Sequence, residues 1–194
     1  MIKKGIKIYP CILILLLPLL TGCFNPLMVE RDSSAGFNGS FEKTKHGLPL
    51  NWYFYTSEEY GKSYKLIFDT VYVKEGEQSL KFEIQSIDTL KLHEELIAPG
   101  MFSYTDAEIG NKYKVSFWIK NLGCKFNIHI GNQFFGFFSE VILETNENLT
   151  DWTYVEYEYT IPESNPSICF GLNFLSPGIF WIDDIKIEKI IPEN

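Results

Sequence analysis

The chain has 194 residues, of which 45% are hydrophobic and 16% aromatic, and it carries a formal net charge of −8 at pH 7. This acidity argues against nucleic-acid binding, because the phosphate backbone requires clusters of Lys and Arg. About 170 residues remain once the N-terminal segment is set aside, which suits one domain with a substantial core.

Residues 1–22 predict a signal peptide. Three lysines within the first seven residues precede an apolar run from Cys11 to Leu20. The run is too short to cross a bilayer as a helix, which needs about 20 residues. It ends in Leu20-Thr21-Gly22-Cys23, which resembles the lipobox of bacterial lipoproteins and implies that Cys23 receives a diacylglycerol. The alternative is an ordinary secretory signal followed by an unrelated cysteine.

The segment after Cys23 predicts a membrane tether. Cleavage removes three lysines and no acid, so the formal charge changes from −8 to −11 and the acyl chains are expected to provide the anchor. Residues 23–36 hold the lipidated cysteine and a short stretch without periodicity, ahead of a domain over 37–191. Phe24 rather than Asp follows Cys23, which by the sorting rule of enteric bacteria favours the outer membrane or cell surface.

The rest of the chain predicts many short strands. Apolar and polar residues alternate, aromatic and β-branched residues dominate, and Gly, Pro, Asn or Asp bounds each run. No window after residue 36 sustains a helical period, so we expect an all-β protein built as an antiparallel sandwich or barrel. Residues 90–110 are expected to be irregular and to cap a sheet or shape a groove. The expected strands are 65–68, 71–73, 79–84, 113–120, 126–130, 154–161 and 180–188.

Several segments follow one another in the order N-G-x-F-E, P-x-x-W, G-x-x-S-L, Y-x-V-S-F-W, W and I-D-D-I. This order resembles the CenC-type carbohydrate-binding modules of the galactose-binding-like jelly rolls. The resemblance implies a jelly-roll β-sandwich that binds glycan without catalysis, although a fold does not settle the ligand. The matching segments are 37–42, 48–52, 75–81, 113–120, Trp152 and 181–187.

The same resemblance implies a structural calcium site. In such jelly rolls the Glu of the opening F-E, carbonyls of the G-x-x-S-L turn and an Asp of the closing strand meet at one edge. These positions are Glu42, Gly76 to Gln78 and Asp183 here, and Ca²⁺ prefers such oxygens. Alternation predicts that Asp183 shares the core-facing side with Ile185, where an unpaired acid is costly. The alternative is that Asp183 accepts backbone N–H bonds and Glu42 is only solvated.

Sugar recognition needs an aromatic ring that stacks on a pyranose, with polar groups beside it. Trp118, Tyr53 and Tyr55 are the expected ligand-binding residues, whereas Trp52 and Trp152 are expected to be structural. Trp118 shares a face with polar residues, and that face is either open or covered by a loop. The phenylalanine-rich stretch 131–138 is either a buried strand with a bulge or an exposed apolar lip.

Enzyme motifs are missing from the sequence. His46, His93 and His129 lack metal-ligand spacing, and no G-x-S-x-G elbow occurs. Cys124 and Cys169 either pair as a disulfide or serve as small buried hydrophobes. The sequence therefore predicts a non-catalytic envelope lipoprotein that binds glycan. The alternative is a structural or adhesive surface protein that contacts protein partners in an envelope complex.

Overall fold

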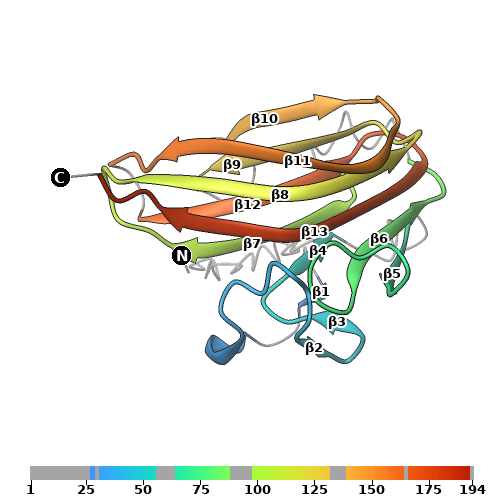
Figure 1. The fold of residues 1–194 in the computed structure, drawn as a ribbon, viewed down its shortest axis with the longest axis horizontal. Helices are drawn as coiled ribbons and strands as arrows, with labels where there is room; N and C mark the ends of the chain where they lie inside the picture. Colours follow the sequence, from blue (N-terminus) through green and yellow to red (C-terminus); the bar gives the residue numbers. More distant parts are fainter. Residues whose placement is uncertain are drawn as a thin grey trace, which may run out of the picture.

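The computed structural model describes residues 27–28, 31–55, 64–87, 98–131, 139–163 and 166–192. Within these ranges the chain forms two large antiparallel sheets, a small hairpin and one short 3₁₀ turn at Ser33–Ala35. The sheets pack face to face, with β11, β8 and β13 side by side in the nearer layer of Figure 1 and β10, β9, β12 and β7 behind them. The predicted all-β sandwich is confirmed.

The two sheets differ in size, and their strand orders mix segments distant in sequence. The six-stranded sheet has the order β1 (Leu27–Met28), β4 (Tyr53–Tyr55), β7 (Gly100–Asp106), β12 (Ser167–Phe174), β9 (Phe126–Gly131), β10 (Ser139–Thr145). The five-stranded sheet has the order β11 (Leu149–Thr160), β8 (Lys112–Leu122), β13 (Gly178–Lys189), β6 (Ser79–Ile84), β5 (Tyr64–Asp69). The hairpin joins β2 (Thr44–Lys45) and β3 (Leu48–Pro49).

The core lies between the two sheets and is rich in aromatic side chains. Trp52 is fully buried there, packs edge-on against Phe170 at 6.0 Å between ring centroids, and donates its indole N–H to the carbonyl of Asn38 at 3.0 Å. The expected structural role of Trp52 is therefore confirmed, whereas Trp152 on β11 is only partly buried. Cys124 and Cys169 are both buried and carry free thiols, so neither forms a disulfide.

Six of the seven expected strands are present, and one is wrong. Residues 71–73 form no strand, and Val71 is 80% exposed in the loop that follows β5. The expectation that residues 90–110 are irregular is also wrong in part, because β7 is an interior strand between β4 and β12. Met101 and Phe102 are adjacent on β7 and both buried, so this strand lacks the alternation that marks a half-exposed strand.

Part of the expected tether lies against the sandwich. The side chain of Asn51 accepts a hydrogen bond from the backbone N–H of Asp32 and donates to the carbonyls of Asp32 and Gly36, at 2.6–2.9 Å. Strand β1 pairs with β4 on the edge of the six-stranded sheet. The segment 1–22 that is predicted to be a signal peptide, the predicted lipidation residue Cys23 and residues 132–138 lie outside the described residues. Among the residues that are described, no helix is long and apolar enough to span a lipid bilayer.

Candidate functional site

The predicted ligand-binding aromatics lie on opposite sides of the sandwich. Trp118 on β8 points outward from the five-stranded sheet, since its neighbours Phe117 and Ile119 are in the core. Tyr53 on β4 points outward from the six-stranded sheet, since Phe54 is in the core. The structure therefore does not bring Trp118 and Tyr53 into one site. Tyr55 ends β4, and its side chain lies outside the described residues.

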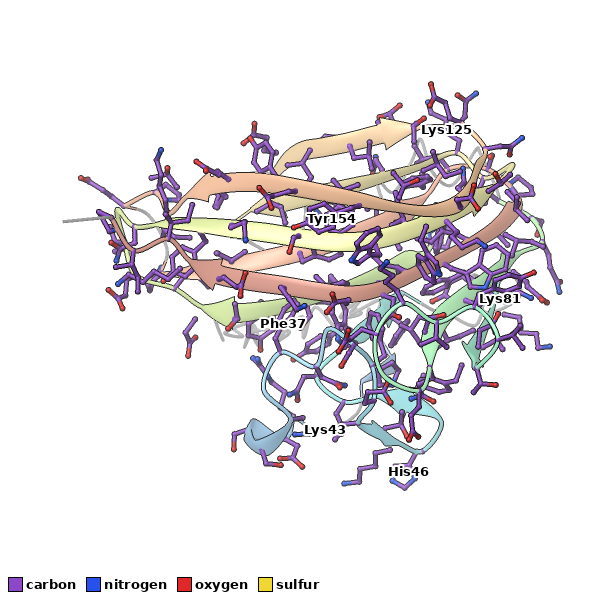
Figure 2. All side chains as sticks on the ribbon, viewed as in Figure 1. Phe37, Lys43, His46, Lys81, Lys125 and Tyr154 are labelled. Carbon is purple, nitrogen blue, oxygen red and sulfur yellow. The ribbon has the colours of Figure 1, made fainter. Side chains whose placement is uncertain are left out.

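The face around Trp118 is covered by the loop between β5 and β6. The ammonium of Lys74 in this loop lies 3.6 Å from the centroid of the Trp118 ring. Tyr154 from β11 packs beside Trp118 at 5.0 Å with its ring tilted by 51°, and it is 46% exposed. Figure 2 shows Tyr154 in the middle of the sheet that faces the viewer. Because a cation already occupies the face of the indole, Trp118 does not present an open stacking surface.

The same loop also covers a second tryptophan of this sheet. Tyr72 packs edge-on against Trp181 of β13, with ring centroids 5.6 Å apart. The ammonium of Lys120 lies 4.1 Å from the centre of the Tyr72 ring. Asp69, at the end of β5, accepts the indole N–H of Trp181 at 2.8 Å. Aromatic and charged contacts thus hold the loop against the sheet over two strands.

Carboxylates bind the backbone of this loop from two sides. Glu42 accepts the N–H groups of Glu77 and Gln78 on one oxygen, at 2.9 and 3.2 Å. Gly76 at the turn has a φ of 74°, and a Cβ there would overlap the carboxyl group of Glu42. The side chain of Gln78 donates to the carbonyl of Phe41 at 2.7 Å. The glycine is therefore required both by the backbone conformation and by the close approach of Glu42.

Asp183 holds the other side of the loop and is fully buried. Its Oδ2 accepts the N–H groups of Lys74 and Glu75 at 2.8 and 3.0 Å, and its Oδ1 accepts the N–H of Asp184 at 2.7 Å. Burial raises the pKa of Asp183 to about 6, against the lowering effect of these N–H groups. The carboxylate is therefore satisfied by backbone donors, as in the alternative interpretation of the sequence.

The predicted orientation of Asp183 is wrong. The register of β13 against β8 shifts between Asp183 and Lys186, and Asp184 has a φ of 52°. This bulge places one extra residue on β13, which reverses the alternation that follows. Asp183 consequently lies on the outer side of the sheet, opposite Trp118, and not with Ile185 in the core. The loop, rather than the core, buries it.

The residues of the predicted calcium site do come together, but with different chemistry. The loop between β5 and β6 contains Gly76 and Gln78, and the carboxylates of Glu42 and Asp183 flank it. The groups that point at both carboxylates are N–H donors, whereas Ca²⁺ is held by oxygens. Nowhere in the described ranges do three or more Asp, Glu, His or Cys side chains form a group suited to a metal ion. The residues as arranged do not fit calcium coordination, and calcium binding stays a prediction.

The outer face of the six-stranded sheet carries a row of side chains that the sequence did not single out together. The row follows the cross-strand register through Tyr53, Phe102, Gly171, His129 and Val141. Tyr53 stacks on Phe102 with centroids 4.8 Å apart and planes within 7°. A Cβ at Gly171 would overlap the imidazole of His129, so the glycine lets this ring lie on the sheet. Strand β12 has only a glycine at this position. The aromatic stack therefore lies on one side of β12, and the imidazole of His129 lies on the other.

Polar groups flank this row. The side-chain nitrogen of Asn173 donates to Asn127 at 3.1 Å on the neighbouring strands β12 and β9. His129 is half-buried, and its Nδ1 has no hydrogen-bond partner within the described part of the chain. Burial lowers the pKa of the His129 imidazole, which favours its neutral form at pH 7. The tyrosine hydroxyls of Tyr53 and Tyr104 are 3.2 Å apart, and burial raises the pKa of Tyr53 to about 12.

Sequence reasoning missed most of this face for an identifiable reason. Of these residues the sequence predicts only Tyr53 as ligand-binding, and for His129 it indicates no more than the lack of metal-ligand spacing. The useful signal was the glycine within the apolar run Ile168–Phe174, since a glycine inside a strand often marks a close approach. That close approach is made by His129.

No protein-family profile matches the chain, and no match is found among curated protein sequences. Solved structures do resemble it. A CBM4 domain is 18% identical over 79% of this chain and 98% of its own, with a TM-score of 0.54. The CBM22-1 xylan-binding domain of Paenibacillus barcinonensis Xyn10C is 11% identical over 80% of this chain and 94% of its own, also with a TM-score of 0.54.

One further resemblance involves an enzyme. The enzymatically active domain of tailspike protein 4 from bacteriophage CBA120 is 16% identical over 78% of this chain but only 20% of its own, with a TM-score of 0.52. At these identities the likenesses establish the fold alone. The chain has the jelly-roll sandwich seen in carbohydrate-binding modules.

Proposed function

We propose that this chain is a non-catalytic lipoprotein that binds a glycan on the outer face of the six-stranded sheet. The observation that carries the proposal is the row through Phe102, Gly171 and His129, where aromatic and polar side chains flank a strand that has no side chain at its centre. A pyranose presents C–H groups on its flat face and hydroxyls around its rim. A binding face for it therefore needs an apolar surface beside directed polar groups.

The side chains of this face supply both kinds of contact. The ring of Tyr104 is half-buried on β7, next to the stack of Tyr53 on Phe102. Asn127 and Asn173 use one donor and one acceptor on each other, which leaves amide capacity for sugar hydroxyls. Among the described residues the buried Nδ1 of His129 has no hydrogen-bond partner, and buried polar atoms usually have one. A sugar hydroxyl or an ordered water would satisfy it.

The comparisons support the class of ligand but not its identity. The similar P. barcinonensis domain is described as xylan-binding, and the other likeness is to a CBM4 domain. This face is preferred to the face of Trp118 because it places the buried Nδ1 of His129 and the amides of Asn127 and Asn173 beside its aromatic rings. On this proposal the lipid on Cys23 holds the glycan-binding domain at the outer membrane or cell surface.

A glycan array and calorimetry on matched variants test the proposal. The protein is the mature chain, with Cys23→Ser so that it is not acylated. Asn127→Ala is expected to weaken binding of any glycan found by about tenfold, the equivalent of one hydrogen bond. The control Trp118→Ala lies on the opposite face and is expected to leave affinity unchanged. Equal losses in both variants would reject this site. No binding across plant, algal, bacterial and host glycans would favour the adhesive alternative.

A further inference from the structure

We infer that the glycan taken by this face carries a carboxylate, as a uronic acid does, and that Arg31 binds it. The inference rests on the proposed function and adds the chemical class of the ligand. Arg31 is the only arginine in the chain, whose other basic residues are all lysines. It lies just before the 3₁₀ turn Ser33–Ala35, within the part of the chain expected to be a free tether.

Arg31 is held against the glycan face by a single residue of β7. Its guanidinium carbon lies 4.1 Å from the centroid of the Tyr104 ring, and its Nη2 donates to the carbonyl oxygen of Tyr104 at 3.0 Å. Tyr104 in turn stacks with Tyr53 at 5.8 Å. The guanidinium is therefore positioned on the same aromatic cluster that forms one side of the glycan face. Stacking on the Tyr104 ring and the bond to the backbone limit the conformational freedom of the Arg31 side chain. Ligand binding therefore costs less conformational entropy at this side chain.

The charge of Arg31 is not matched by a carboxylate in the described part of the chain. Over the described ranges no Asp or Glu lies within salt-bridge distance of it, although the chain contains 25 acids. Its neighbour Asp32 uses its carboxylate for the N–H and the hydroxyl of Ser34, at 2.8 and 2.7 Å. The guanidinium has five N–H donors, and both of its partners among the described residues belong to Tyr104, the carbonyl oxygen and the phenol. An exposed, oriented and unpaired guanidinium in an acidic protein is suited to an external anion.

The geometry favours a carboxylate over a neutral hydroxyl. A guanidinium binds a carboxylate through two parallel N–H···O bonds, which a hydroxyl cannot accept. One carboxylate opposes this interaction, since Asp106 follows Tyr104 by two residues on the same side of β7 and is exposed. A single cation beside an acid contacts one carboxylate of the bound oligosaccharide. Substitution of the neighbouring Asp106 is therefore expected to change the affinity in the opposite direction to substitution of Arg31.

The experiment compares acidic oligosaccharides with the same molecules made neutral. Hexamers of galacturonate, alginate and glucuronoxylan are titrated into the mature chain before and after their carboxyl groups are reduced to alcohols. Arg31→Gln is expected to weaken binding of the acidic form by about tenfold and to leave binding of the reduced form unchanged. Asp106→Asn is expected to strengthen binding of the acidic form alone. Arg31→Lys keeps the positive charge but lacks the paired N–H donors of the guanidinium. It is expected to retain only part of the wild-type affinity.

The outcomes separate this inference from the proposed function. Equal binding of acidic and reduced oligosaccharides, or an unchanged affinity in Arg31→Gln with a normal melting temperature, overturns the carboxylate inference and leaves glycan binding intact. Binding of neither form to this protein, while the broader array is also negative, overturns both. An acidic ligand whose affinity does not fall as salt rises from about 0.1 to 1 M also contradicts a charge contact.

Discussion

Replacing Asp183 with Asn tests whether the buried carboxylate that holds the loop between β5 and β6 stabilises the fold or strains it. Asp183 accepts three backbone N–H groups, which favour its charge, yet burial raises its pKa to about 6 from an ordinary value of 3.8. The difference between 3.8 and about 6 corresponds to about 3 kcal/mol. Burial therefore outweighs the hydrogen bonds, and the folded state favours the protonated form more than the unfolded chain does.

The sign of the pH effect follows from the direction of the shift. A folded-state pKa above the unfolded value gives stability that is fully present below about pH 4 and is lost as the pH rises through about 6. Asn cannot ionise, so Asp183→Asn lacks this loss. The free energy of unfolding of the wild type, minus that of Asp183→Asn, is expected to fall by about 3 kcal/mol between pH 4 and pH 7. Any fixed difference in packing between the two side chains cancels from this change.

Urea denaturation at a series of pH values measures the difference, with unfolding followed by tryptophan fluorescence. The matched control is Asp184→Asn, because Asp184 makes a surface ion pair with Lys186 at 2.8 Å, and such pairs contribute up to about 1 kcal/mol. A difference between wild type and Asp183→Asn that stays constant from pH 4 to pH 7 would refute the reasoning. It would mean that the N–H groups keep Asp183 ionised throughout.

Other substitutions test separate parts of the molecule. Gly39→Ala is expected to abolish folding, because its Cβ would overlap the carbonyl oxygen of Ile185. The control Gly47→Ala has open space and only a positive φ to accommodate. Circular dichroism melts of Gly47→Ala should therefore show a loss of about 1–2 kcal/mol in the free energy of unfolding. Calcium binding predicts a melting midpoint that falls when a chelator is added, and an unchanged midpoint rejects it. Cys23→Ser is expected to abolish acylation by alkyne-labelled palmitate in a bacterial host, and retained label would place the lipid elsewhere.

The alternation of apolar and polar residues predicts a strand when one face of that strand is exposed to solvent. The strands β6, β8 and β13 each have polar side chains on their outer face, and their positions were predicted to within a few residues. The strands β7 and β12 were not predicted because apolar side chains lie on both of their faces. Phe102 and Cys169 lie on the outer face, Met101 and Phe170 lie in the core, and all four are buried. These strands therefore show no alternation of apolar and polar residues.

An alternating pattern is also insufficient where no partner strand is available. Residues 71–73 alternate, yet they lie in a loop, because Tyr72 packs against Trp181 and Val71 is left exposed. Strand order decides which outer faces coincide, and local sequence does not contain it. Trp118 and Tyr53 each looked suited to a sugar, but the order of strands puts them on opposite sheets. The partnership of Tyr53 with Phe102 and Tyr104 depends on the pairing of β4 with β7.

The position of Asp183 illustrates how one extra residue redirects a functional prediction. An inward acid among core residues suggested a metal, because a buried charge needs a strong partner. The bulge at Asp184 turns Asp183 outward, and the loop supplies N–H donors that take the place of a cation. Yet burial still raises its pKa, so these donors offset the cost of the charge only in part. A cation that bound beside Asp183 would lower that pKa, and the pH dependence of stability would then flatten in the presence of calcium for the wild type but not for Asp183→Asn.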